Sequence, residues 1–114
     1  MRKRYIPCDQ HWLDFFDQYE FYKTHRKLPI KNINRRRLKN KIGKNEVLCM
    51  LVDFRQEGWM PITIDKNYNL VDGQHRLAFA DQMCLEYIDV AIFDESLMRN
   101  YNKKYAKNEL GIFG

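Results

Sequence analysis

The stretch that decides the fold is residues 71–78, VDGQHRLA, in which an apolar run passes through Asp72-Gly73 into a predicted helix. The first turn of that helix carries His75 and Arg76. A cationic side chain at a helix start opposes the positive end of the macrodipole, at about 0.3–1 kcal/mol, unless an anion lies there. The pattern therefore predicts a bound anion at this turn, and phosphate is the natural candidate.

The residues of this turn have the properties of a phosphate site. Gly73 lets the backbone turn sharply and approach a ligand, and the amides that follow it have no partner within the helix. Arg76 can bind two phosphate oxygens, His75 can donate a hydrogen bond or transfer a proton, and Gln74 supplies a neutral donor and acceptor. A structural role fits the same residues, because Asp72-Gly73 is an ordinary turn dipeptide and Asp72 can cap the helix.

The composition describes one globular domain. The chain has 114 residues, of which 45% are hydrophobic and 14% aromatic, so it can form a single core and is too apolar to be disordered. No apolar stretch approaches the roughly 20 residues that span a bilayer, and the charged start is not followed by the apolar segment of a secretory signal. We therefore expect a cytoplasmic protein with no membrane partner.

The cysteines indicate reduced thiols rather than a disulfide framework. Cys8, Cys49 and Cys84 are odd in number and form no Cys-x2-Cys pair. Cys8 and His11, with the distant His25, resemble half of a zinc site, but the fourth ligand is missing. No metal site is predicted.

The positive charge is concentrated in the N-terminal part of the chain. Residues 1–45 hold 13 Lys and Arg against 4 Asp and Glu, whereas residues 46–114 hold 7 against 11. A local basic patch is the electrostatic footprint expected of a nucleic-acid-binding surface, although a solvated surface fits the same charges. The residues expected to contact nucleic acid are Lys31, Arg35, Arg36, Arg37, Lys39 and Lys41.

Hydrophobic spacing predicts two helices in the N-terminal half. The first covers residues 9–27, with Asp9 as its N-cap and Pro29 ending it. The second covers residues 45–57, and Gly58 closes it in the C′ position. The second helix owes its amphipathic pattern to Val47, Leu48, Leu51, Val52 and either Phe54 or Arg55.

The C-terminal half predicts a hairpin, the motif helix, a strand and a last helix. Residues 59–64 are expected to form a strand entered through proline, and residues 70–71 the strand that returns from a polar turn. On the motif helix, Leu77, Ala80 and either Cys84 or Met83 are expected to face the core. The later elements are the motif helix over 74–84, a strand over 87–93 and a peripheral helix over 97–109.

This order of elements predicts the α+β class, with a small mixed β-sheet flanked by helices. Residues 1–114 are interpreted as a single domain. Its expected parts are a basic helical N-terminal extension (1–44), a motif-bearing core (45–94) and a peripheral helix and tail (95–114).

Residues 45–94 resemble the ParB/sulfiredoxin-like fold in both motif and order. The matching segments are Gly58-x2-Pro61-Ile62-x-Ile64, the 71–78 motif, and Ile88-x-Val90-x-Ile92. The resemblance implies nucleotide-phosphate binding at a Gly-x-x-Arg turn and the adjoining helix. Proteins of this fold include partition proteins that bind and hydrolyse CTP, sulfiredoxins, free-serine kinases and nucleases, so the fold does not fix the reaction.

Residue by residue, the resemblance favours phosphate binding over sulfur chemistry. Gly73 and Arg76 match the shared Gly-x-x-Arg, and His75 matches the His-Arg pair of sulfiredoxins and kinases. Gln74 stands where sulfiredoxins have their catalytic cysteine, and an amide is no sulfur nucleophile. The partition proteins also carry a helix-turn-helix domain, for which 114 residues leave no room, so partition by this chain alone is not expected.

The leading hypothesis is a stand-alone domain of this fold that binds a nucleotide, or the phosphate of a nucleic acid, at the Asp72–Arg76 turn. A nucleoside triphosphate with Mg²⁺ is the expected cofactor. If the domain is an enzyme, a nucleotide triphosphatase or a nuclease, Asp72, His75 and Arg76 are its candidate catalytic residues, and Gly73, Gln74, His75 and Arg76 bind phosphate. Asp72 is a single carboxylate, so a metal ion there would need further ligands from substrate phosphates, or from Glu57 or Asp53.

Two other classes of function fit the sequence. One is a non-catalytic DNA-binding or regulatory module that uses the basic residues. The other is a protein inhibitor of the kind found in phages, plasmids and other mobile elements, whose basic N-terminal region docks onto a partner protein.

Overall fold

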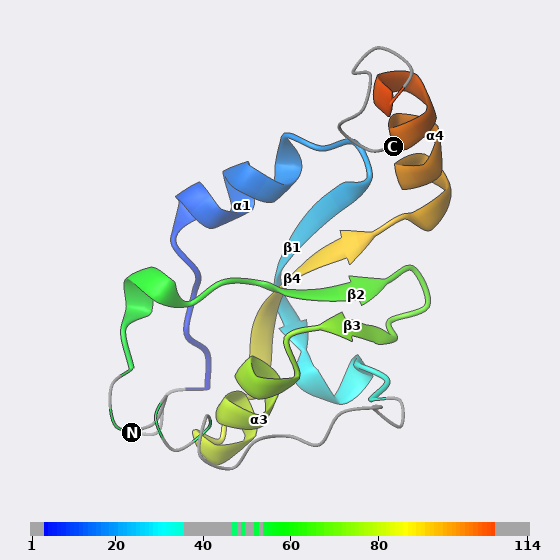
Figure 1. Cartoon of the computed structure of the whole chain (residues 1–114). Coiled ribbons are helices and arrows are strands. Elements are labelled where there is room, and N and C mark those ends of the chain that lie inside the picture. The colour runs from blue at the N-terminus through cyan, green and yellow to red at the C-terminus, as the bar shows by residue number, and fades with distance from the viewer. Residues whose placement is uncertain (1–3, 36–46, 48, 50–51, 53, 107–114) are drawn as a thin grey trace.

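A computed structural model describes residues 4–35, 47, 49, 52 and 54–106 of the chain. Their strands form one mixed sheet flanked by helices (Figure 1), which confirms the predicted α+β class. No helix in this part of the chain has the length and apolar character to cross a membrane. In chain order the elements are α1 (Gln10–Asp17), β1 (Tyr22–Pro29), η1 (Ile30–Asn32), η2 (Gln56–Gly58), β2 (Ile62–Asp65), β3 (Leu70–Asp72), α3 (Gln74–Gln82), β4 (Tyr87–Phe93) and α4 (Glu95–Ala106), where η marks a short 3-10 helix.

The sheet has the strand order β1-β4-β2-β3. β4 pairs with β1 antiparallel and with β2 parallel, and β3 pairs antiparallel with β2 at the edge. The expected hairpin of β2 and β3 is confirmed. The carboxylate of Asp65 holds its turn by accepting hydrogen bonds from the amides of Asn67 and Asn69, each at 2.9 Å. β3 then delivers the chain to α3.

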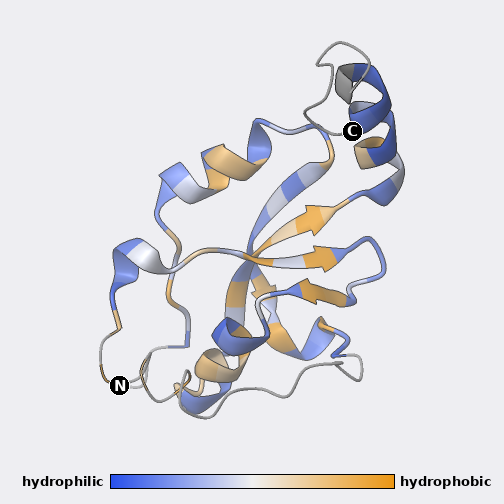
Figure 2. Cartoon of the chain, viewed as in Figure 1, coloured by the Kyte–Doolittle hydropathy of each residue, from blue (hydrophilic) through white to orange (hydrophobic). Residues whose placement is uncertain are grey.

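Cross-strand pairing sorts the side chains of β4 onto two faces of the sheet. Val90 shares its face with Ile62 of β2, and α3 packs there, because Gly73 at its start lies against the Ile62 side chain. Asp89 points to the opposite face, where the amide of Cys8 donates a hydrogen bond to its carboxylate. The middle of β4 is buried on both faces, and Figure 2 shows apolar residues along β2, β3 and β4.

The predicted helix over residues 9–27 is wrong beyond Asp17. α1 ends there, and residues 22–29 form β1, which pairs along its length with β4. The aromatic residues that suggested a helix run across a turn, and the long-range pairing with β4 outweighs their local spacing. The N-terminal part is therefore built into the sheet and core rather than added to them. Its buried core residues are Ile6, Cys8, Leu13, Leu28, Ile30 and Ile33.

The second predicted helix ends earlier than expected. Residues 47, 49 and 52 are helical and Val47 is buried, but Val52 is 87% exposed, and residues 54–55 are not helical. Gly58 closes η2 instead, without the left-handed backbone of a C′ glycine. Leu48 and Leu51 lie outside the described residues.

The C-terminal half follows the prediction closely, except that β2 begins at Ile62 rather than at residue 59 and that one expected core position is exposed. β4 has the expected bounds, α3 is slightly shorter than expected, and α4 begins slightly earlier. Leu77 and Ala80 are buried as predicted. Met83 and Cys84 are exposed, because α3 ends at Gln82 and Cys84 adopts a left-handed φ of 57°.

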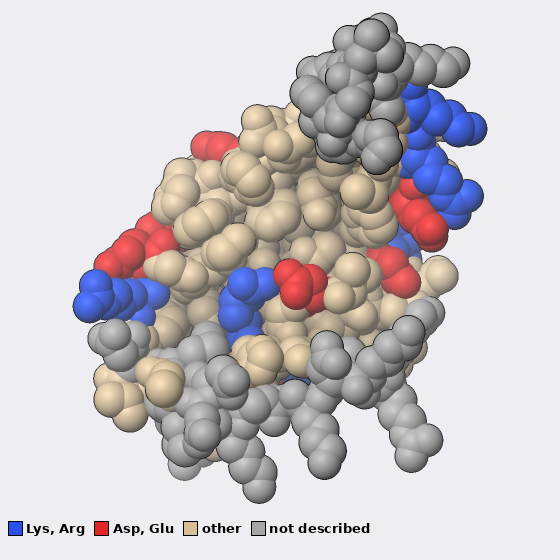
Figure 3. All heavy atoms as spheres, viewed as in Figure 1, with Lys and Arg blue, Asp and Glu red and all other residues tan. Residues whose placement is uncertain are grey.

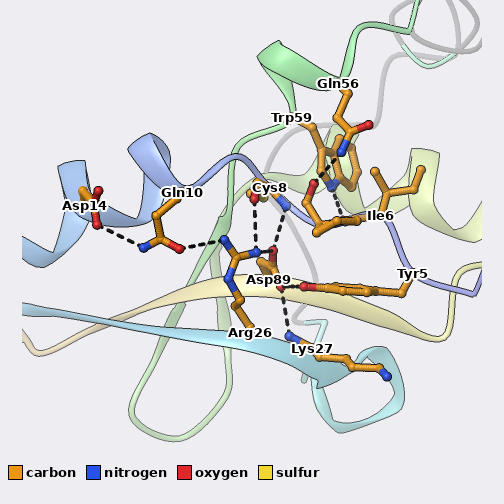
Figure 4. Close-up of polar contacts among 11 residues, drawn as sticks. Tyr5, Ile6, Cys8, Gln10, Asp14, Arg26, Lys27, Gln56, Trp59 and Asp89 are labelled. Atoms are coloured by element: carbon orange, nitrogen blue, oxygen red, sulfur yellow. Dashed lines mark hydrogen bonds and ion pairs between the residues drawn. The ribbon is translucent and has the colours of Figure 1, made fainter.

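A buried carboxylate connects β4 to β1 and to the N-terminal segment (Figure 4). Asp89 is completely buried in the middle of β4. A bulge in β1 places two residues, Arg26 and Lys27, opposite it. The hydrogen-bond donors to its carboxylate are the Tyr5 hydroxyl (2.5 Å), the Cys8 amide (2.8 Å), the Lys27 amide (2.9 Å) and Nη1 of Arg26 (3.1 Å).

We expect Asp89→Ala to lower the free energy of unfolding by roughly 3–5 kcal/mol, because the substitution leaves one buried and three partly buried donors unpaired. Tyr5→Phe removes one donor and keeps the acceptor, so it should cost only about 1 kcal/mol. Urea denaturation followed by tryptophan fluorescence measures both values. Small and equal losses in the two variants would contradict the role of Asp89 as the common acceptor.

Candidate functional site

Gly73 makes the sharp turn between β3 and α3. It is the N-cap of α3 and has a φ of 105°, and a Cβ atom at this position would lie 2.6 Å from Cγ2 of Ile62. Only glycine combines this backbone conformation with so close an approach. α3 has no side-chain cap, so Asp72 does not cap it. The amides of residues 74–76 have no acceptor within the helix, whose first bond joins the Leu77 amide to the Gly73 carbonyl.

Arg76 is a largely buried cation at the positive end of α3. Its side chain is 21% exposed, and burial lowers its pKa. Nη2 lies 3.7 Å from Oδ2 of Asp72, and Nη1 donates to the Met60 sulfur at 3.8 Å. Among the described residues, Nε of Arg76 is buried without a hydrogen-bond partner. Such a donor costs about 1–3 kcal/mol, so the site favours an added acceptor.

The other motif residues lie at the same strand-to-helix turn as Arg76. Asp72 ends β3 and its side chain is 79% exposed, while Gln74 and His75 occupy the first turn of α3 and are partly exposed. The fold therefore brings Asp72, Gly73, Gln74, His75 and Arg76 together at one helix start, as the sequence predicts. Backbone amides and a guanidinium at the positive end of a helix dipole are groups that can bind an anion.

The basic segment is only partly described, and its described part is not a free cationic surface. Arg35 binds both carboxylate oxygens of Asp81 on α3, with Nη2 2.7 Å from Oδ1, and this hydrogen bonding raises its pKa. Lys31 lies exposed in η1. On the face in Figure 3, the described Lys and Arg side chains lie near Asp and Glu rather than forming one continuous basic surface. The candidates Arg36, Arg37, Lys39 and Lys41 lie outside the described residues.

Cys8 has the environment of a structural thiol. It is buried, and burial together with the neighbouring Asp89 charge raises its pKa to about 12, so it stays protonated at neutral pH. In the described ranges, no group of three or more His, Cys, Asp or Glu side chains is placed to hold a metal ion. Glu57 lies in η2, and Asp53, the other candidate helper of Asp72, is outside the described residues.

Sequence reasoning missed two residues that shape the site. Met60, which precedes β2, provides the sulfur next to Arg76. Asp89 fixes the N-terminal segment, whose Ile6 carbonyl accepts a hydrogen bond from the buried indole of Trp59 at 3.0 Å. A charged residue within the apolar run of β4 was the available signal for Asp89, whereas nothing in the sequence points to Met60.

The structure is similar to two solved structures of the N-domain of a pNOB8-like ParB, one of them in a C2221 form. Their TM-scores are 0.52 and 0.51. Each match covers 75% of the present chain, with 17% sequence identity. The chain spans about a third of each of those chains, 34% and 32%. No protein-family model and no curated protein matches the sequence. The chain therefore has a ParB-like fold, as its sequence resemblance predicted, and this similarity establishes the fold alone.

We expect Gly73→Ala to destabilise the protein by at least about 2 kcal/mol, because it adds backbone strain and an overlap with Ile62. The matched control is Gly58→Ala, since a Cβ atom there meets nothing within 4 Å. Thermal and urea unfolding of both variants measure the difference. Equal stability of the two variants would show that the turn does not require glycine.

Proposed function

We propose that this chain binds the phosphate groups of a nucleotide at the start of α3. The observation that carries the proposal is the buried Nε of Arg76, which has no acceptor among the described residues. A phosphate oxygen would satisfy this donor and would offset the charge that burial makes unfavourable. Asp72 offsets it only weakly, because its carboxylate is exposed and 3.7 Å away.

The backbone at the turn suits the same ligand. Gly73 keeps the start of α3 free of a side chain, and the amides of residues 74–76 carry the positive end of the helix dipole. A phosphate group placed there accepts from amides and guanidinium together. This arrangement is more specific for phosphate than a basic surface is, because the N–H donors match the directions of the phosphate oxygens as well as their charge.

The residues present fit a nucleotide that brings its own Mg²⁺. The ion would be held mainly by the phosphates, as is usual for Mg²⁺, and the exposed carboxylate of Asp72 would be its nearest protein ligand. Bound Mg²⁺ would neutralise part of the phosphate charge. Gln74 and His75, in the same turn, would add hydrogen bonds to the phosphate oxygens.

The pairing of Arg35 with Asp81 favours a nucleotide over a nucleic acid as the ligand. Arg35 is engaged by Asp81 and is therefore less available for a phosphate backbone. The ParB-like fold supports the proposal as a scaffold only, since one fold serves many functions.

The test is thermal unfolding with ATP, CTP or GTP, each at millimolar concentration with Mg²⁺. A nucleotide at 100 times its Kd stabilises the folded state by about 2.7 kcal/mol, which raises the Tm of a domain of this size on the order of 10 °C. We expect such a rise with at least one nucleotide, and we expect Arg76→Gln to abolish it.

Arg99→Gln is the matched control. Arg99 also pairs with the carboxylate four residues before it, Glu95, at 2.9 Å, but its side chain is 68% exposed on α4. This variant should keep the full rise in Tm. The absence of any rise with all three nucleotides, or an equal loss of the rise in both variants, would refute the proposal.

A further inference from the structure

A pocket lies between the N-terminal segment, the bulge of β1 and the start of β4. Its volume is about 600 Å³, within the range of small-molecule sites. None of its residues belongs to the 71–78 motif, so it is separate from the proposed nucleotide site. The lining residues are Arg4, Tyr5, Ile6, Pro7, Lys27, Gln56 and Tyr87.

Lys27 is fixed in this pocket in an unusual conformation. Its φ is 60°, in the left-handed region that side chains other than glycine rarely adopt, and its amide donates to Asp89. Its ammonium group lies 5.2 Å from the ring centre of Tyr87 and 5.8 Å from that of Tyr5. Strained residues of this kind are concentrated at functional sites, and here the two tyrosine rings lie next to the ammonium group of such a residue.

The charges of the pocket leave an ammonium group available for an anion. Among the described residues, the Lys27 ammonium group has no carboxylate partner, and it lies over the two tyrosine rings. Arg4, the second cation of the pocket, lies 3.6 Å from Glu86, and both side chains are at least half exposed, so this pair is weak. The Tyr5 hydroxyl donates to Asp89 and is thus already used.

We propose that this pocket binds a small phosphorylated molecule, with the ammonium of Lys27 and the guanidinium of Arg4 on its phosphate. Two cations match a phosphate monoester, which carries nearly two negative charges at neutral pH. The ring of Tyr87 provides an apolar wall beside the phosphate for the rest of the molecule.

The experiment is an NMR titration of the ¹⁵N-labelled full chain with inorganic pyrophosphate, at an ionic strength held constant with chloride. We expect saturable shifts of the Lys27 and Tyr87 amide signals. Lys27→Gly should weaken binding at least tenfold while it keeps the fold, because glycine accepts the φ of this position without strain. Lys23→Gln, an exposed lysine on the same strand, is the control and should leave the affinity unchanged.

Two further results decide the proposal. Arg76→Gln should not change the shifts of Lys27 and Tyr87, so this site and the nucleotide site can fail separately. If Lys27→Gly does not fold, Arg4→Gln replaces it and should weaken binding as well. Shifts that do not saturate, or an affinity that is the same in the wild type and in these pocket variants, would overturn the proposal.

Discussion

The buried carboxylate of Asp89 is the constraint on which the rest of the structure depends. A buried carboxylate in the middle of a sheet is tolerated only when donors surround it, and the chain supplies them from both the N-terminal segment and β1. The bulge in β1 lies opposite Asp89. It places two residues, Arg26 and Lys27, across from this one carboxylate, and both donate hydrogen bonds to it. The N-terminal segment is thereby held against the sheet.

This attachment reaches the start of α3 through a short series of contacts. The held segment accepts a hydrogen bond from the buried indole of Trp59, and the next residue, Met60, touches the guanidinium of Arg76. On its other side the guanidinium faces Asp72 at the end of β3. Arg76 is thus positioned by packing more than by charge, and its Nε has no hydrogen-bond partner among the described residues.

The sequence predicts the parts of the fold whose signals are local. The β2–β3 hairpin follows from its polar turn, β4 from its apolar run, and the Gly73 turn from the residue type alone. β1 was missed because an edge strand with a bulge has no regular alternation, and its pairing partners lie 58–71 positions further along the chain. The same limit applies to contacts: the partners of Asp89 and the pairing of Arg35 with Asp81 are set by the fold and leave no trace in local spacing.

The residues of the candidate site could be predicted from the sequence, but their burial and their contacts could not. Glycine, histidine and arginine at a helix start point to an anion through the helix dipole. The burial of Arg76 and its contact with Met60 could be learned only from the packed structure. These features make the hypothesis of a phosphate site specific, because they identify Nε of Arg76 as the donor that lacks an acceptor among the described residues.

The most direct measurement is therefore the ¹H–¹⁵N NMR signal of the Arg76 side-chain Nε, followed while a nucleoside triphosphate with Mg²⁺ is added. If the account is right, its Hε proton shifts downfield and exchanges more slowly with water as the nucleotide saturates, while the Nε signal of Arg99 stays unchanged. An Arg76 signal that does not change at millimolar ATP, CTP and GTP would contradict the assignment of the α3 start as a phosphate site.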